Sequence, residues 1–251
     1  MNHMEEKLTK GIRADGRKFD EIRKIEIEYN ISKNAEGSAR CRLGETEVLA
    51  GVKLEIGTPY TDSPDEGSIV VNAELGPISN PDFVSGPPGA EATEIARLVD
   101  RGIRESKAVD FKKLCIKSGE KVWIFLIDIY TTNDAGNLID AAYYASLAAL
   151  KEIRMPKVKD DKIVFGEYTK DKMKLEKFPI NFTFGKIGKH IILDPSMEEE
   201  KFLDARLTLA VDNKHVHSMQ KNGNGSFSLE EIEQIIDIAF RKDAEVKKLF
   251  K

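Results

Sequence analysis

Cysteine, tryptophan and long apolar runs are all scarce in this chain of 251 residues. Its two cysteines, Cys41 and Cys115, lie far apart in apolar stretches, which is typical of reduced core thiols in an intracellular protein and argues against a disulfide-stabilised secreted scaffold. No run reaches the about 18 apolar residues of a membrane-spanning helix, and the N-terminus lacks the apolar core of a signal peptide. We therefore expect a cytoplasmic protein with no membrane partner.

A large excess of charge of either sign is also missing. The chain contains 39 lysines and arginines and 43 acidic residues, which gives a formal net charge of -4. This balance excludes a global positive field, so any site for a polyanion has to be a local patch. The single tryptophan offers no obvious platform for stacking bases, which predicts little sequence preference toward a nucleic acid. With 41% hydrophobic and 33% charged residues, the composition is that of a globular protein.

The hydrophobic periodicity changes several times along the chain and predicts both strands and helices. Strands are expected at 25–30, at two runs within 37–56, and at 68–75, 121–130, 178–185, 190–193, 207–211 and 215–220. Helices are expected at 91–108, 137–154 and 228–249, with a short helical lead-in within 5–22. The nearly continuous apolar run at 121–130 predicts a central strand buried on both faces.

This order of elements predicts an α+β fold, in which mixed β-sheets carry helices packed on them, rather than a doubly wound sheet. Residues 157–177 are charged and irregular in pattern, and they are the best candidate for a boundary between two αβ halves. We therefore expect an N-terminal half at 1–156, a connecting segment at 157–177 and a C-terminal half at 178–251.

Two segments raise the question of a metal site. Residues 220–231 partly match a calcium-binding EF-hand loop, but the first position lacks an aspartate and a strand precedes the segment in place of a helix. The pattern favours a glycine-rich turn followed by a helix-capping box formed by Ser228 and Glu231. His215 and His217 share one face of a strand, but no third ligand is in sight, which favours an ordinary polar strand face.

The turn at 133–140 follows a buried strand and opens a helix, where backbone N–H groups and the helix dipole can bind a phosphate. A phosphate cradle usually adds a hydroxyl and a basic side chain, whereas this turn supplies Asn137, Leu138 and aspartates. The alternative is a simple helix N-cap provided by Asp134.

A row of arginines marks the helix expected at 91–108. Arg97, Arg101 and Arg104 recur at spacings of four and three residues, so they project from one face and could contact successive phosphates. The alternative is a solvated face on which these arginines pair with acidic neighbours. The acidic residues available for such pairs are Glu94, Asp100 and Glu105.

Several separated motifs give the chain a family resemblance over nearly its whole length. Residues 11–17, Gly-Ile-Arg-Ala-Asp-Gly-Arg, together with 20–23, 37–39 and 47–52, resemble the RNase PH-like phosphorolytic exoribonucleases. The motifs Gly-Pro-Pro at 86–88, Glu-Ile-Ala-Arg-Leu-Val-Asp-Arg at 94–101 and Asp-Ala-Gly-Asn-Leu-Ile-Asp-Ala-Ala at 134–142 are similar to the non-catalytic RNase PH-like subunit of the archaeal exosome. The resemblance implies an RNase PH-like fold.

The chemistry that the resemblance implies is attack of inorganic phosphate on the last RNA linkage, which shortens RNA from its 3′ end. Catalytic members bind that phosphate with a Gly-Gly-Ser/Thr-Arg turn, and here Asn137 and Leu138 fall at the hydroxyl and arginine positions. Of the acidic pair of catalytic members, Glu200 falls at the first position and Arg206 at the second, and a guanidinium can neither accept the proton nor bind a cation. The resemblance thus implies a subunit with no catalytic residues, no metal and no cofactor.

The resemblance also implies partners. Non-catalytic subunits of this kind alternate with catalytic RNase PH-like subunits in a hexameric ring, which carries RNA-binding cap subunits and degrades single-stranded RNA. Arg97 and Arg101 match positions that bind RNA near the dimer interface, and Arg104 shares their spacing. The alternative function is a phosphorolytic exoribonuclease active on its own, which would need Glu200 or Asp204 and a relocated phosphate site.

Overall fold

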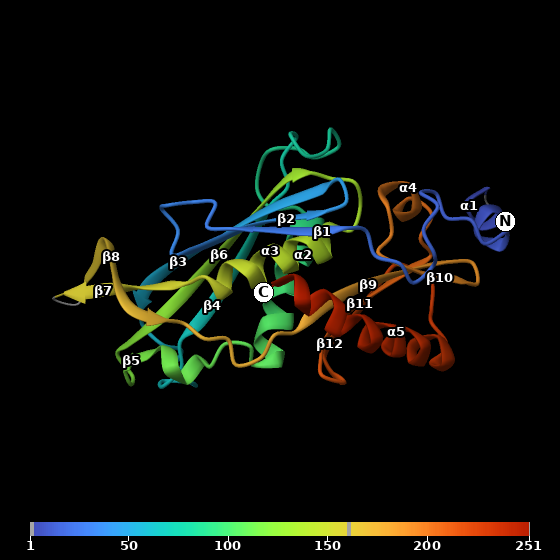
Figure 1. The fold of residues 1–251 in the computed structure, drawn as a ribbon. Coiled ribbons are helices and arrows are strands. Elements are labelled where there is room, and N and C mark those ends of the chain that lie inside the picture. Colours follow the sequence, from blue (N-terminus) through green and yellow to red (C-terminus); the bar gives the residue numbers. More distant parts are fainter. Residues whose placement is uncertain (1–2, 160–161, 251) are drawn as a thin grey trace.

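A six-stranded mixed sheet forms the first part of the molecule, and a four-stranded antiparallel sheet forms the second (Figure 1). The computed structural model describes residues 3–159 and 162–250. The first sheet has the order β1-β2-β3-β6-β4, with β5 paired to β6, and only β4 runs parallel to its neighbour. Its strands are β1 (Ile25–Tyr29), β2 (Gly37–Leu43), β3 (Thr46–Gly57), β4 (Ser68–Glu74), β5 (Cys115–Lys117) and β6 (Lys121–Asn133).

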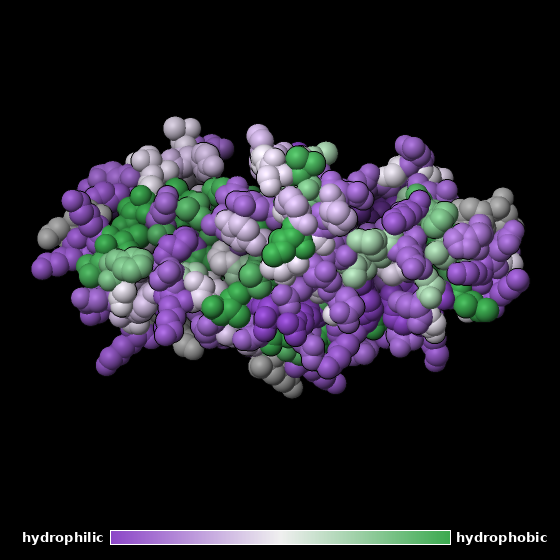
Figure 2. All heavy atoms as spheres, turned by 90° about the horizontal axis from the view of Figure 1, so that it is seen from above, coloured by the Kyte–Doolittle hydropathy of each residue, from purple (hydrophilic) through white to green (hydrophobic). Residues whose placement is uncertain are grey.

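Only one face of the first sheet is fully covered. Along β6, Phe125, Ile127 and Ile129 are buried, whereas the residues between them are only partly buried and Tyr130 is 46% exposed. The expectation that this strand is buried on both faces is therefore wrong, because helices cover one side of the sheet only. Figure 2 shows hydrophobic side chains concentrated over the end of the molecule that holds this sheet, and a mainly hydrophilic surface at the N-terminal end.

Helices α2 (Ala90–Ser106) and α3 (Leu138–Lys151) supply the covered side. Every residue of α3 except Lys151 is buried, and its small side chains permit close approach to β2 and β3. A Cβ on Gly37 of β2 would clash with the carbonyl oxygen of Ala149, so glycine is required at this crossing. The expected helix at 137–154 ends earlier, at Lys151.

The second sheet has the order β10-β9-β11-β12 and carries the C-terminal helix. Its strands are β9 (Ile180–Ile187), β10 (His190–Leu193), β11 (Ala205–Asp212) and β12 (His215–Asn222). A single turn of helix, α4 (Met197–Glu200), follows β10, and α5 (Leu229–Lys247) closes the chain before a short 3-10 turn at Lys248–Phe250. The capping box predicted for Ser228 and Glu231 is confirmed at the start of α5.

The segment at 157–177 is not irregular as its pattern suggested. Strands β7 (Arg154–Lys159) and β8 (Lys162–Lys172) pair as a hairpin that projects from the far end of the first sheet (Figure 1). Its cross-strand contacts include the Lys157–Glu167 ion pair and the Arg154 guanidinium over the Tyr168 ring. Mostly exposed, charged strands have no apolar alternation, so the hairpin left no periodic signal in the sequence.

The N-terminal segment packs on the second sheet although it opens the chain (Figure 1). Helix α1 (His3–Thr9) is shorter than the expected lead-in and buries Met4 and Leu8 against Ile187 and Ile192. Beyond it, the fully buried Arg13 binds both carboxylate oxygens of Glu199, at 2.9 and 2.7 Å. The N-terminal segment is thereby fixed to α4.

Candidate RNA-binding face and a filled phosphate turn

The turn between β6 and α3 is closed by the chain's own side chains. Asn137 is the N-cap of α3, with φ at 53°, and its side-chain oxygen accepts from the N–H of Asp140 at 3.3 Å. The alternative in which Asp134 caps this helix is wrong, because Asp134 instead accepts from the N–H of Gly136 within the turn, at 2.9 Å. The N–H of Ala135 donates to the hydroxyl of Thr46, at 3.2 Å. Few donors of this turn remain for a ligand.

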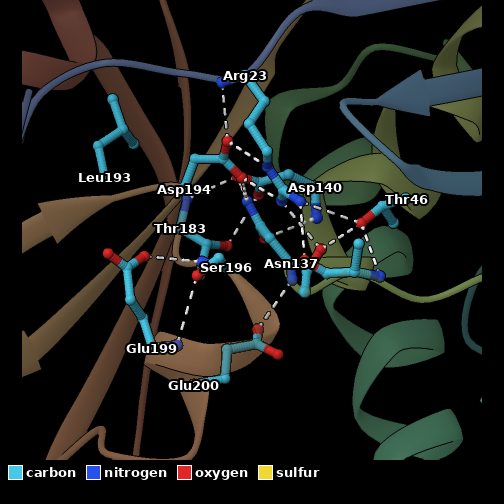
Figure 3. A network of polar contacts seen from close by, with 12 residues as sticks. Arg23, Thr46, Asn137, Asp140, Thr183, Leu193, Asp194, Ser196, Glu199 and Glu200 are labelled. Atoms are coloured by element: carbon cyan, nitrogen blue, oxygen red, sulfur yellow. Dashed lines mark hydrogen bonds and ion pairs between the residues drawn. The ribbon is translucent and has the colours of Figure 1, made fainter. Parts of the chain in front are cut away.

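Glu200 occupies the place that an anion would take at this helix terminus. Its Oε1 accepts from the backbone N–H of Asn137 at 2.9 Å (Figure 3). Burial raises the pKa of Glu200 to about 7, although the Asn137 N–H and the charge of Arg206 act in the opposite direction. A carboxylate of the protein thus fills the anion position of the turn.

Asp194 is a buried carboxylate that binds two arginines and the N-cap residue of α3. Arg23 donates to both of its oxygens, at 2.9 and 2.7 Å, Arg17 donates at 2.8 Å, and the amide of Asn137 donates at 2.8 Å (Figure 3). Burial alone would raise the pKa of Asp194, but the hydrogen bonds and charges of the two arginines outweigh it and hold the pKa below its usual range. A carboxylate held ionised by two arginines serves structure and not proton transfer.

Asp140 is the other buried carboxylate of this network. It accepts from the amide of Asn181 at 2.8 Å and from the N–H and hydroxyl of Thr183 at 2.9 and 2.8 Å. Burial raises the pKa of Asp140 to about 6 despite hydrogen bonds from Asn137 and Thr183. All of its partners belong to α3's cap or to β9, so it ties the helix to the second sheet.

Arg206 lies where the resemblance places a catalytic acid. Its Nη2 is 2.8 Å from Oε2 of Glu94, and both side chains are largely buried. Asp204, an alternative acid, binds the N–H of Gly188 at 2.7 Å. The region therefore offers an ion pair where catalytic members need a free acidic pair.

Helix α2 presents two arginines beside a groove. Arg97 is exposed, and within residues 3–159 and 162–250 no hydrogen bond or ion pair holds its guanidinium. Arg101 is half-buried and makes only a long contact of 3.4 Å from Nη1 to the side-chain oxygen of Gln220. Both line a groove of about 410 Å³ that Asn72 of β4 and Pro88 also border. Two cations with little internal pairing beside a groove can bind an extended polyanion.

Arg104 does not join this pair. Its guanidinium binds both oxygens of Asp100, at 2.7 and 3.1 Å, and the carbonyl oxygen of Ile69 at 3.2 Å. It also lies over the ring of Phe111, 5.4 Å from the centroid. The three arginines share a helical spacing, but the structure brings only Arg97 and Arg101 to the groove.

The residues considered as metal ligands make contacts with other side chains of the protein. Asn222 donates to both oxygens of Glu94 at 2.8 Å, and Glu231 pairs with Lys186 at 2.7 Å. The rings of His215 and His217 stack with centroids 6.3 Å apart. Throughout the part of the chain that the structure describes, no three His, Cys, Asp or Glu side chains gather as a metal site.

No helix among the described residues has the length and hydropathy to cross a membrane.

The sequence reasoning missed the arginine cluster that binds Asp194 and Glu199. Arg13, Arg17 and Arg23 lie in an irregular segment, and their partners follow about 180 residues later. The only signal was the motif at 11–17 itself, since periodicity carries no information on such distant pairs.

Comparisons with known proteins match these features. The model of the 3′ exoribonuclease family matches in both its domains, the first over residues 21–156 and the second over 177–242. The exosome complex component Rrp42 of Methanopyrus kandleri is 43% identical over 97% of this chain and 92% of its own length. The Rrp42 of Methanosarcina acetivorans is 46% identical over 97% of this chain and 90% of its own. The chain belongs to the Rrp42 group of the 3′ exoribonuclease family.

Solved structures agree with this assignment to the Rrp42 group. A chain of the Archaeoglobus fulgidus exosome, solved with RNA bound to the active site, superposes with a TM-score of 0.92 at 41% identity, over 99% of this chain and 96% of that one. A chain of an archaeal exosome core gives 0.87 at 39% identity, over 99% and 94%. The α+β RNase PH-like fold and the resemblance to the non-catalytic exosome subunit are thereby confirmed.

Proposed function

We propose that this Rrp42-type chain works inside an archaeal exosome core, next to a catalytic RNase PH-like subunit, and guides single-stranded RNA with Arg97 and Arg101. The observation that carries the proposal is the pair of weakly engaged guanidiniums beside a groove on α2. Phosphate contacts of this kind position a strand without reading its sequence. The RNA-binding cap subunits dock on the assembled ring.

The filled phosphate turn supports a division of labour between two subunits. Leu138 replaces the arginine of catalytic members, and Glu200 already occupies the N–H of Asn137. Arg206 stands in an ion pair where an acid is needed. Phosphorolysis by the isolated chain would require an anion to displace a carboxylate of the protein, so the chemistry belongs to the partner.

The test is phosphorolysis of a single-stranded RNA by the purified chain, alone and mixed with its catalytic partner, with and without inorganic phosphate. We expect nucleoside diphosphates only from the mixture and only with phosphate. The chain alone could release nucleoside diphosphates because of a contaminating enzyme. In that case a Glu200→Ala variant purified in parallel would show the same activity, and further purification would remove it. Release by the chain alone that persists through purification would establish the alternative, an exoribonuclease active by itself.

RNA guidance is tested separately by reversing Arg97 and Arg101 to glutamate in the reconstituted complex. We expect weaker RNA binding with the complex intact, and a smaller dependence of affinity on salt, because fewer counterions are released. Unchanged RNA affinity at moderate salt would refute the guiding role.

A further inference from the structure

Glu94 is an acidic residue of α2 close in sequence to the two groove arginines. Glu94 lies three residues before Arg97 and seven before Arg101, so helical geometry places all three on one side. An unpaired carboxylate at that point would repel the phosphates that the arginines attract. The affinity of this face for a polyanion therefore depends on what neutralises Glu94.

Arg206 is the cation that neutralises it. It reaches from β11 across to α2 and pairs with Glu94 at 2.8 Å, with side chains that are 20% and 17% exposed. Because the pair is mostly shielded from water, salt screens it less than an exposed pair. Two neutral groups of β12 complete the contacts of Glu94, the amides of Asn222 at 2.8 Å and of Gln220 at 3.4 Å.

The influence of Arg206 extends beyond this one partner. Burial raises the pKa of Glu91, on the first turn of α2, and of Glu200, on α4, and the charge of Arg206 acts against both rises while Asp134 adds to them. Gln220 joins Glu94 to Arg101 by two long contacts of 3.4 Å each. Arg206 is thus the cation shared by three acidic side chains near the groove, those of Glu91, Glu94 and Glu200.

We infer that Arg206 is a positioning residue for RNA: by neutralising and holding Glu94, it makes the Arg97 and Arg101 face of α2 attractive to a phosphate backbone. The inference rests on the proposed function, since it concerns the same groove. It assigns a role to an arginine that stands where catalytic relatives need an acid. Arg206 itself need not touch RNA.

The test is a double-mutant cycle on the reconstituted complex, with RNA affinity measured between low and high salt for wild type, Arg206→Ala, Glu94→Ala and the double variant. We expect Arg206→Ala to weaken binding about tenfold at low salt, with the difference shrinking as salt screens the exposed carboxylate. Glu94→Ala should bind at least as well as wild type. The double variant should recover most of the loss, and Arg206→Lys should retain most of the affinity.

Thermal unfolding of each variant separates this role from a structural one. If Arg206 only supported the fold, removing Glu94 as well would not restore RNA binding. Equal affinities for Arg206→Ala and wild type at every salt concentration, while Arg101→Glu still weakens binding, would overturn the inference and leave the proposed function standing. If Arg97→Glu and Arg101→Glu also had no effect, the proposed function itself would fail.

Discussion

The side chain of Glu200 accepts a hydrogen bond from the backbone N–H of Asn137, the N-cap of α3, at 2.9 Å. Helix N-termini attract anions because their N–H groups lack partners within the helix. Here Glu200 of α4 supplies a carboxyl oxygen in place of an external anion. The loss of phosphate chemistry therefore involves a substitute ligand as well as missing side chains.

Replacing Glu200 should change how stability depends on pH. The pKa of Glu200 is raised from 4.5 in the unfolded chain to about 7 in the fold, so folding favours the protonated carboxyl group. The stability that results is fully present below pH 4.5 and is lost as the pH rises through about 7. Glu200→Gln keeps an acceptor oxygen and stays neutral. Between pH 4.5 and 8, wild type should lose up to about 3 kcal/mol of unfolding free energy relative to this variant.

Urea unfolding at several pH values measures the difference. The exposed neighbour Glu198→Gln is the matched control, and its curve should run parallel to that of wild type. A Glu200→Gln curve that also runs parallel to wild type would show that Glu200 is not held in this environment.

Arg97 and Arg104 should respond differently to removal. Arg97→Ala is expected to weaken RNA binding by the complex about tenfold at low salt and to reduce the slope of log affinity against log salt by about one. Arg104→Ala should leave both nearly unchanged, because its guanidinium is engaged by Asp100 and the Ile69 carbonyl. Fluorescence anisotropy across a salt series reads both quantities, and equal losses for the two variants would contradict the assignment.

Asp194 should be indispensable for stability. Asp194→Asn removes the charge that compensates Arg17 and Arg23, both about 10% exposed, and such uncompensated buried charges typically cost about 3–5 kcal/mol. Thermal denaturation should show a large fall in the midpoint. Glu26→Gln breaks only the exposed pair with Lys24 and should leave the midpoint unchanged.

The segment at 220–231 should not bind calcium. Asn222 and Glu231 already hold Glu94 and Lys186, and β12 replaces the helix that would enter a calcium loop. Isothermal titration with calcium chloride should show no saturable heat. Uptake abolished by Glu231→Gln would restore the metal hypothesis.

Much of the fold could be predicted because burial leaves periodic traces. The strands at 25–29 and 68–74 and the helix at 90–106 follow the expected ranges closely, since each has one face against the core. The hairpin at 154–172 left no such trace, because most of it faces solvent. We retain as a proposal the division into halves at 1–156 and 178–251, linked by 157–177.

The candidate site was harder to predict than the fold. Spacing alone grouped Arg104 with Arg97 and Arg101, and only the tertiary partners of Arg104 separate it from them. The substitution of Arg206 for an acid was visible in the sequence, but its pairing with Glu94 depends on β11 lying beside α2.

The anchoring of Arg13 sets an order of events during synthesis. Arg13 leaves the ribosome 186 residues ahead of Glu199, its buried partner. Burying a guanidinium without its carboxylate is costly, so we expect the segment around Arg13 to stay in water until Glu199 has been made. The buried contact of Arg13 can form only after α4 has been made, so the segment before β1 docks later than the first sheet to which it is joined in sequence.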